Sequence, residues 1–264
     1  MLGQGRRVVR SGLARLVAAE WVKASSTRSL WWLLAAALAY TAFTTAVSIA
    51  VTNSVTSFST AFVLDTPRGI RAVLADANAG SILAVVVGIL GVTSEYRHRT
   101  MAQTLLVTPD RRRVLLGKVA TYALVGLAFG VLDCVVALAV AVPWLSSLHL
   151  LVPVLSGDAG LVLGGVVLAT VLFCLMGLGL GALVKNQVAA VIIALAWLLL
   201  IQNVLQVLPG ARDAITGGAA IALFREAPSS AHLLPAWAGA LVLLGYAVVL
   251  IVAGGTALVY RDAG

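Results

Sequence analysis

The stretch that decides the fold is ANAGSILAVVVGILGVTSEYRHRTMAQTLLVTPDRRRVLLGK, residues 77–118. It begins with an uncharged, mostly apolar run, Ala77–Thr93, and continues into a loop, residues 94–119, that contains six Lys or Arg residues. An apolar run that approaches about 20 residues is long enough for a helix to cross a bilayer. Lys and Arg accumulate in loops on the cytoplasmic side. The stretch therefore predicts a membrane-spanning helix followed by a cytoplasmic loop.

The rest of the chain has the same apolar character. Of its 264 residues, 61% are hydrophobic and 11% are charged, whereas soluble domains contain about 25% charged residues. No two-residue alternation of the kind found in β-barrel strands appears in the apolar segments. We predict an all-α membrane protein with six transmembrane helices in a domain at residues 30–259. The six spans are expected at residues 30–51, 77–93, 120–142, 159–184, 188–208 and 236–259.

The distribution of basic residues predicts the orientation. Of the 18 Lys and Arg residues, six precede the first span, six lie between the second and third spans, and Lys185 and Arg261 are on the same side. The opposite side contains Arg68, Arg71, Arg212 and Arg225. This bias predicts that both termini, including a short tail at residues 260–264, are cytoplasmic. The net charge of +8 reflects topology and attraction to anionic lipid, so it does not indicate a nucleic-acid-binding protein.

The N-terminal segment, residues 1–29, contains a candidate interfacial helix. Apolar residues recur there at the spacing of one helix face, at Leu13, Leu16, Val17, Trp21 and Ala24. We predict an amphipathic helix over Ser11–Thr27 that lies along the inner membrane surface, with Trp21 at the depth of the lipid headgroups. The alternative is a solvated basic tail.

The loop after the second span contains a helix start signal. Thr108 suits an N-cap, Pro109 suits the first helical position, and Asp110 complements the positive end of the helix dipole. We predict a short helix that starts at Pro109, carries Arg111–Arg113 and continues into the third span. Such a helix can transmit a push from a soluble partner into the membrane. The alternative is that the three arginines only determine topology.

Polar residues in or beside the spans are further candidates. Asp133 is the one acid inside a predicted span, where an acid costs about 2.5–3.5 kcal/mol. It is expected either to serve as a proton relay, substrate contact or gate, or to accept a buried hydrogen bond from a Ser, Thr, backbone or second-copy group. Glu95 is spaced to pair with Arg99 on one helix face, or it belongs to a partner interface. Gln202 and Asn203 either line a polar path or hydrogen-bond across helices.

Other patterns concern packing. Glycines four residues apart allow helices to approach closely, and such pairs occur at positions 126/130, 160/164 and 177/181. The loop at 209–235 contains an apolar patch, Ala219–Phe224, which forms either a re-entrant segment or a surface helix. Cys134 and Cys174 lie inside predicted spans and are expected to be small buried hydrophobes, not a disulfide or a metal pair.

With these features the chain resembles the ABC-2 type permeases, the membrane subunits of bacterial ABC exporters. The resemblance extends over nearly the whole chain and rests on the six-span plan and several short motifs. These are Glu20-Trp21-Val22-Lys23 with Ser26-Thr27-Arg28; Glu95-Tyr96-Arg97-His98 with Thr100; Thr104-Leu105-Leu106 with Pro109, Arg111 and Lys118; and Gly177-Leu178-Gly179 with Asn186. The family commonly has Gly after the His of the second motif, where this chain has Arg99.

The resemblance implies a role for each region. It identifies Ser11–Thr27 as an interfacial elbow helix and Thr108–Lys118 as the coupling helix that meets an ATPase. The implied coupling residues are Thr108, Pro109, Arg111, Arg112, Arg113 and Lys118. Two six-span subunits, either two copies of this chain or one copy and a related permease, are expected to form the substrate pathway in a bacterial plasma membrane.

The chain itself is not expected to be an enzyme. It contains no G-x-x-x-x-G-K-[ST] phosphate loop, so ATP and Mg²⁺ are expected on a separate ATPase subunit. No cofactor or metal is expected on this chain, because no catalytic or metal-ligand spacing occurs. The alternative function is a proton-coupled secondary transporter in which Asp133 carries the proton. The apolar spans favour an amphipathic substrate, whose identity stays open.

Overall fold

The computed structural model describes residues 4–55, 67–97, 111–148, 158–206, 216–224 and 235–260. Within these ranges all regular structure is helical and no strand occurs. The elements are α1 (Gln4–Ser26), α2 (Arg28–Val55), α3 (Pro67–Ala75), the 3₁₀ segment η1 (Asp76–Gly80), α4 (Ser81–Arg97), α6 (Arg111–Ser147), α7 (Asp158–Val184), α8 (Gln187–Ala196), the π-helical segment η2 (Trp197–Ile201), α9 (Gln202–Gln206), α10 (Thr216–Leu223) and α11 (Ala236–Tyr260).

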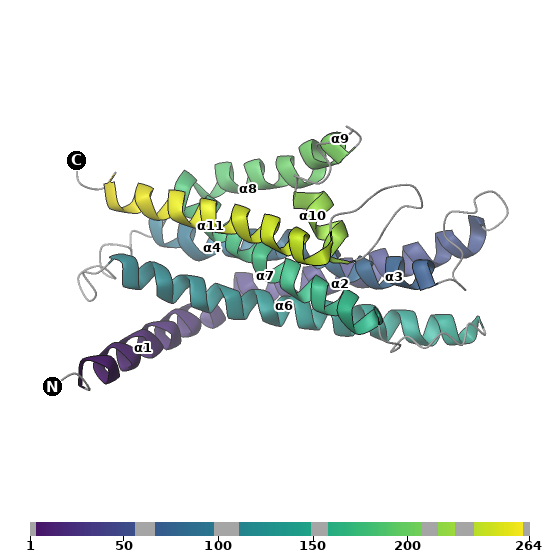
Figure 1. Cartoon of the computed structure of the whole chain (residues 1–264), viewed down its shortest axis with the longest axis horizontal. Coiled ribbons are helices and arrows are strands. Elements are labelled where there is room, and N and C mark those ends of the chain that lie inside the picture. Colours follow the sequence, from purple (N-terminus) through teal and green to yellow (C-terminus); the bar gives the residue numbers. More distant parts are fainter. Residues whose placement is uncertain are drawn as a thin grey trace.

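In the described part of the chain, six helical segments are long and apolar enough to cross a membrane, as the prediction of six spans requires. They are Arg28–Thr52, Gly69–Arg97, Arg113–Ser147, Ala159–Val184, Gln187–Leu205 and Ala236–Ala257. The long helices run roughly along the long axis of the molecule, and α1 begins at the same end at which α11 finishes (Figure 1). An even number of crossings produces this arrangement. The side of the membrane that this end faces stays a prediction.

The second span is longer than the sequence predicted. α3, η1 and α4 follow one another directly, so the candidate span covers Gly69–Arg97 rather than Ala77–Thr93. The charged Arg71 and Asp76 interrupt the apolar pattern and obscured its first part. The apolar residues around them, Ile70, Val73, Leu74 and Ala75, are nevertheless buried. A stretch of 3₁₀ helix inside a longer helix often marks a hinge or a strained sequence, and here the stretch begins at Asp76.

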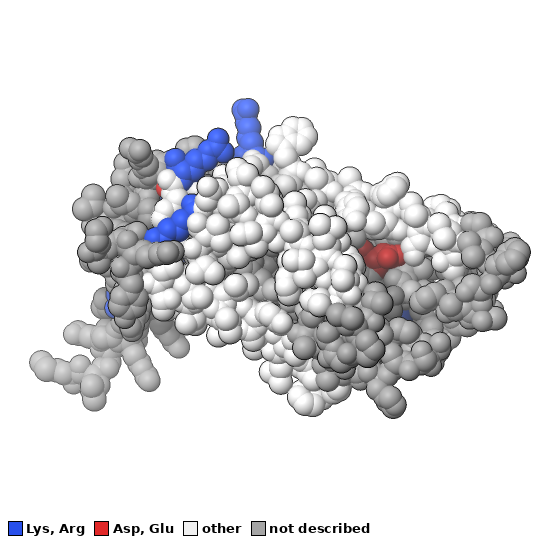
Figure 2. Space-filling model, turned by 90° about the horizontal axis from the view of Figure 1, so that it is seen from above, with Lys and Arg blue, Asp and Glu red and all other residues white. Residues whose placement is uncertain are grey.

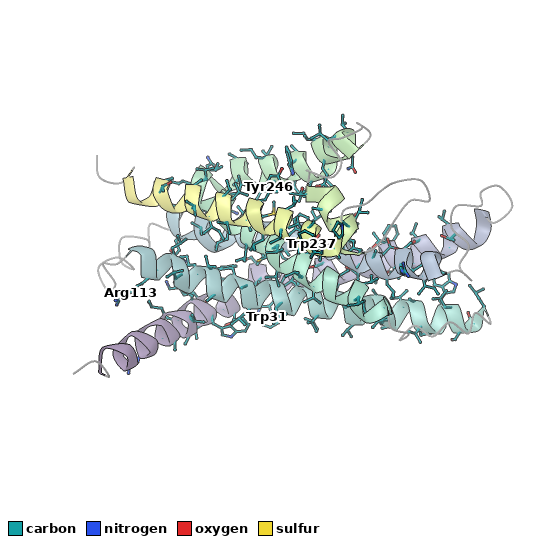
Figure 3. The ribbon with its side chains drawn as sticks, viewed as in Figure 1. Trp31, Arg113, Trp237 and Tyr246 are labelled. Carbon is teal, nitrogen blue, oxygen red and sulfur yellow. The ribbon has the colours of Figure 1, made fainter. Side chains whose placement is uncertain are left out.

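The third span is a single helix of 37 residues that begins at Arg111. The arginines predicted to lie on a short helix are therefore in the first turn of the third span itself. Thr108, Pro109 and Asp110 lie outside the described residues. Arg113 lies at the end of the molecule where α1 begins (Figure 3). Most of the Lys and Arg side chains visible in Figure 2 gather at this same end.

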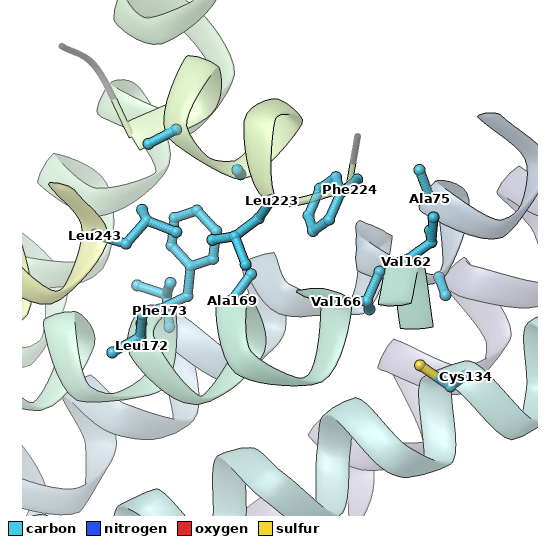
Figure 4. Close-up of a cluster of buried hydrophobic side chains, with 14 of the residues drawn as sticks. Ala75, Cys134, Val162, Val166, Ala169, Leu172, Phe173, Leu223, Phe224 and Leu243 are labelled. Atoms are coloured by element: carbon cyan, nitrogen blue, oxygen red, sulfur yellow. The ribbon is translucent and has the colours of Figure 1, made fainter. Parts of the chain in front are cut away.

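The central helix is α7, which packs against α4, α6 and α11. Side chains of α7 such as Leu172 and Phe173 meet Leu223 and Leu243 in the main apolar cluster (Figure 4). This cluster, together with a second one around α4 and α6, forms the interior of the bundle. Cys134 and Cys174 are buried in these clusters as free thiols, as predicted.

Glycines allow the helices around α7 to approach closely. A Cβ at Gly126 would lie 2.9 Å from the Cα of Val171, and a Cβ at Gly177 would collide with the carbonyl oxygen of Val85. The predicted close packing is confirmed for the pairs at 126/130 and 177/181. The pair at 160/164 is different, because a Cβ at either position would meet no described atom within 4 Å.

The apolar patch Ala219–Phe224 belongs to α10 and its following residue. Most of α10 is buried, and it packs against α11 and α7. Gly239 of α11 and Gly165 of α7 leave room for the backbone carbonyls of Ala219 and Leu223. The surface-helix alternative is therefore wrong. α10 is a short buried helix inserted beside α11.

Candidate functional site

Four charged side chains from three helices meet at the end of the bundle where α1 begins. Lys118 of α6 is 2% exposed, and its Nζ lies 2.6 Å from Glu20 Oε2 of α1 and 2.8 Å from Glu95 Oε1 of α4. Lys23 of α1 completes the group, with its Nζ 2.9 Å from Glu20 Oε1 and 3.3 Å from Glu95 Oε1. We call Glu20, Lys23, Glu95 and Lys118 the ionic cluster. It contains two acids and two bases, so its charges balance.

The crossing of α1 over α6 positions the cluster. Leu16 packs on Gly117, where a Cβ would lie 3.4 Å from the Cβ of Leu16. One residue later in α1, the carbonyl of Val17 accepts a hydrogen bond of 3.3 Å from the Thr121 hydroxyl. Glu20 follows Val17 by three residues and so lies on the same helix face, opposite Lys118. The contact of Leu16 with Gly117 and the hydrogen bond from Thr121 to Val17 thus mark where α1 crosses α6, and this crossing brings Glu20 beside Lys118.

The charges of Glu20 and Lys23 are stabilised by their neighbours. Burial raises the pKa of the Glu20 carboxyl, but the charge of Lys118 and the hydrogen bonds from Lys118 and Lys23 outweigh burial and lower the pKa below its ordinary value. Burial lowers the pKa of Lys23, but the hydrogen bond to Glu20 and the charges of Glu95 and Glu20 raise it above its ordinary value. Both groups are therefore ionised at neutral pH.

The turn between α7 and α8 joins the same end of the bundle. Lys185 adopts a left-handed backbone conformation with φ of 59°, and its Nζ lies 5.4 Å from the centre of the Tyr96 ring, within cation–π range. Asn186 caps α8, its side-chain oxygen accepting hydrogen bonds from the backbone N–H groups of Val188 and Ala189. The turn between the fourth and fifth spans therefore contacts the last turn of α4, next to Glu95.

The predicted coupling residues divide into three groups. Arg113 is exposed, and Arg111 and Arg112 precede it in the first turn of α6, although their side chains are not described. Thr108, Pro109 and His98 lie outside the described residues. Lys118 does not extend the exposed basic surface, because it is buried two turns further along α6. Of the motif after span two, Arg97 is exposed and Tyr96 is half-buried.

The sequence did not reveal the partners of Glu95. It left Glu95 either to pair with Arg99 on one helix face or to belong to a partner interface, and Arg99 lies outside the described residues. In the structure Glu95 contacts Lys118 and Lys23 from two other helices. Glu95, Lys118 and Lys23 each lie in a motif quoted for the family resemblance, so the sequence did single them out. Nothing in the spacing showed that the motifs meet.

The apolar residues of α1 do not share one environment. Leu16 and Val17 are partly covered by α6, and Ala24 is buried. Trp21 is 43% exposed. The side chain of Leu13 is not described. One part of the predicted interfacial face is therefore used for packing on α6, and Trp21 remains available to the headgroup region.

Asp133 is 0% exposed and lies between α2 and η1. Its Oδ1 accepts a hydrogen bond of 3.0 Å from the Thr41 hydroxyl of α2. Its Oδ2 has no hydrogen-bond partner among the described residues. The predicted hydrogen bond to a Ser or Thr is thus present, but it satisfies one oxygen only.

Gln202 and Asn203 have different roles. Gln202 Oε1 accepts a 2.8 Å hydrogen bond from Thr216 of α10, and Thr216 Oγ1 accepts a 3.1 Å hydrogen bond from the indole N–H of Trp197. Asn203 is exposed, and its amide donates to the carbonyl of Leu199 in its own helical segment. Gln202 therefore bonds across helices, as one of the two alternatives predicted, at the end of the π-helical segment η2.

Among the described residues, no group of three or more His, Cys, Asp or Glu side chains is arranged to hold a metal ion. In the comparisons with known proteins, no family model matches the sequence, and no match was found among curated proteins.

Proposed function

We propose that this chain is the membrane-spanning permease subunit of an ATP-driven exporter of the ABC-2 type. In this proposal two six-span subunits form the substrate pathway, and a separate ATPase supplies the energy. Support comes from the motif resemblance at residues 20–28, 95–118 and 177–186. It also comes from the way these motifs meet, since Glu20, Glu95 and Lys118 belong to different motifs and contact one another in the ionic cluster.

The ionic cluster is the observation that carries the proposal. α4 ends two residues after Glu95, and α6 begins seven residues before Lys118, so both helices contribute to the cluster close to these ends. Lys118 follows Arg111 by seven residues, about 10 Å along the helix axis. A force applied to the start of α6 therefore acts close to Lys118. Because breaking a buried ion pair is strongly unfavourable, α1, α4 and α6 are expected to move together.

The proposed cycle uses this connection. ATP binding draws two ATPase subunits together, and they push the segment from Thr108 to Lys118. The push moves α1, α4 and α6 relative to the second permease subunit, and the pathway alternates between inward and outward access. The apolar spans favour an amphipathic substrate that enters from the bilayer. In this proposal the chain lies in a bacterial plasma membrane with both termini in the cytoplasm.

Site-specific photo-crosslinking tests the proposal. A photoreactive amino acid in place of Arg113, which is exposed at the proposed coupling end of α6, is expected to crosslink an ATPase in native membranes. The matched control places it at Ser147, which is exposed at the other end of the same helix and is expected to give no such product. Crosslinking of the ATPase from Ser147 and not from Arg113 would contradict the proposal.

Charge reversal gives a second test. Arg111→Glu with Arg112→Glu is expected to abolish ATPase binding while the chain remains folded and inserted. The control is Arg212→Glu with Arg225→Glu, two arginines predicted on the opposite side. Equal ATPase binding by both double variants would count against coupling through the start of α6.

One observation favours a second function, a proton-coupled secondary transporter. Asp133 is fully buried in a span and has one carboxyl oxygen without a hydrogen-bond partner among the described residues. Intramembrane acids often belong to proton pathways. If transport stops when the proton gradient is dissipated and continues when ATP is depleted, this function is correct and the exporter proposal is not.

A further inference from the structure

The corner between α1 and α2 presents exposed tryptophans and an arginine. On α1, Trp21 and Ser25 are four residues apart and share a helix face, and the Ser25 hydroxyl donates a 2.8 Å hydrogen bond to the carbonyl of Trp21. On α2, Trp31 and Trp32 follow Arg28 by three and four residues, so these side chains also share a face. We call Trp21, Ser25, Arg28, Trp31 and Trp32 the corner surface.

One hydrogen bond joins the two faces. The indole N–H of Trp31 donates to the backbone carbonyl of Ser25 at 2.9 Å, and Trp31 lies where α1 gives way to α2 (Figure 3). The intervening turn is tight, because the backbone N–H of Thr27 donates to Ala24 and the carbonyl of Thr27 accepts from Leu30. The Trp31 ring is therefore held across the corner, and the two helix faces form one surface.

The described part of the chain leaves the indoles of this surface largely uncovered. Trp21 is 43% exposed, Trp31 58% and Trp32 75%. Neighbouring large apolar side chains that are exposed together mark an interaction surface. Tryptophan has an apolar ring and a polar N–H group, and it is enriched where a membrane meets water. The corner surface therefore suits the headgroup layer of a bilayer.

The length of the first span places the corner surface at the same depth. The candidate span Arg28–Thr52 has 25 residues, which extend about 37 Å as a helix, whereas the hydrocarbon core is about 30 Å thick. With the excess divided between the two ends, Arg28 lies outside the hydrocarbon, at the level of the lipid phosphates. Trp31 and Trp32 lie about one turn further in, at the edge of the hydrocarbon.

The exposed charge of the corner surface is positive. Arg28 is exposed, and none of the ion pairs between described residues includes it. Glu20 of the adjoining α1 is buried and paired with Lys118 and Lys23, so its charge is already balanced. A guanidinium group binds phosphate through two parallel hydrogen bonds. Arg28 is therefore available to an anionic group from the membrane.

We propose that the corner surface binds one anionic phospholipid from the adjacent leaflet, with the phosphate on Arg28 and the glycerol backbone against Trp31 and Trp32. A zwitterionic phospholipid such as phosphatidylcholine carries a cationic group beside its phosphate, which Arg28 repels, so the site prefers a lipid with net negative charge. Trp21 borders the lipid on α1. The site requires no ATPase and is independent of the proposed exporter function.

Quenching of tryptophan fluorescence by brominated lipids tests the site. The purified full chain is placed in nanodiscs that contain equal amounts of phosphatidylglycerol and phosphatidylcholine, and bromine is carried on the acyl chains of one lipid or of the other. The wild type is expected to be quenched more strongly by brominated phosphatidylglycerol. The expected preference at the site is about fivefold, which is the factor that one basic residue contributes at an anionic membrane surface.

Three variants locate the effect. Arg28→Gln is expected to remove the excess quenching by phosphatidylglycerol. Arg15→Gln is the matched control, because it removes the same charge from an exposed position of α1 that lies about 15 Å along the helix from Ser25. This control is expected to keep the excess. Trp31→Phe with Trp32→Phe removes the two indoles that report the lipid and is expected to abolish the excess.

Two results would overturn the site. In the first, both brominated lipids quench the wild type equally. In the second, Arg15→Gln lowers the excess as much as Arg28→Gln, which would assign it to general attraction between a basic chain and an anionic membrane. Size-exclusion chromatography checks the fold of each variant. If Arg28→Gln does not fold, the double tryptophan variant decides the question, because excess quenching that persists in it would place the lipid elsewhere.

Discussion

Lys118 of α6 lies 2.6 Å from Glu20 of α1, although 98 residues separate them in the sequence. Glu95 of α4 occupies the other side of the same ammonium group at 2.8 Å. Because the Lys118 side chain is almost completely buried, this contact differs from an exposed ion pair, which contributes little to stability. It fixes three helices to one another at the end of the bundle that carries the exposed Arg113.

Lys118→Met is expected to destabilise the protein by about 3–5 kcal/mol, because it leaves two buried carboxylates with Lys23 as their one remaining partner in the ionic cluster. The melting temperature of the purified chain in detergent measures the loss, and hydrogen exchange of α1 reports whether this helix detaches.

The double variant Lys118→Met with Glu95→Leu is the control for that prediction. It keeps Glu20 paired with Lys23 and removes the unbalanced charge, so it is expected to be more stable than Lys118→Met alone. If the double variant were less stable than the single one, uncompensated charge would not be the reason for the loss.

Docking of α1 is expected to be independent of pH near neutrality. The pKa of Glu20 is lowered in the folded state, so its contribution is fully present above its ordinary pKa and is lost as pH falls through the lowered value. The pKa of Lys23 is raised, so its contribution is lost only as pH rises through the raised value. Hydrogen exchange of α1, corrected for intrinsic rates, checks this. A loss of protection between pH 6 and pH 8 would refute it.

Gly177→Ala is expected to destabilise the bundle, because the added methyl group collides with the carbonyl oxygen of Val85. Overpacking of this kind costs about 1–3 kcal/mol. Gly164→Ala is the matched control, since it meets no described atom within 4 Å and adds the same group to the same helix. A melting-temperature series compares them, and equal effects would mean that α4 and α7 are not packed as closely as described.

Thr216→Val is expected to lower stability by about 1–3 kcal/mol, because it leaves Gln202 and Trp197 without their shared hydrogen-bond partner. Asn203→Leu, which removes only a bond within an exposed helical segment, is expected to have a smaller effect. Thermal unfolding followed by tryptophan fluorescence distinguishes them. A larger effect of Asn203→Leu would show that the contact between α10 and η2 is unimportant.

The number of spans was predictable because the length and apolar character of a membrane helix are imposed by the bilayer. The start of the second span was not, since Arg71 and Asp76 interrupt its pattern although the apolar residues around them are buried.

The individual polar residues of the candidate site could be predicted from the sequence, but the contacts between them could not. The sequence singled out Glu95, Lys118 and Asp133 by charge and position. The burial of Lys118 depends on where α1 crosses α6, a crossing at which Leu16 meets Gly117 and Thr121 donates to the carbonyl of Val17. Likewise, a buried hydrogen bond from a Ser, Thr, backbone or second-copy group was one of the two alternatives for Asp133, but the identity of the donor as Thr41 depends on the packing of α2 against α6. Contacts over such sequence distances are not encoded in local spacing.

Purification of the tagged chain from its native membrane in mild detergent, followed by mass spectrometry, tests the central claim most directly. The account predicts an equimolar protein that carries a G-x-x-x-x-G-K-[ST] phosphate loop and is lost from the Arg111→Glu, Arg112→Glu variant. Recovery of the chain without any such protein, under conditions that keep other transporter complexes intact, would contradict the account.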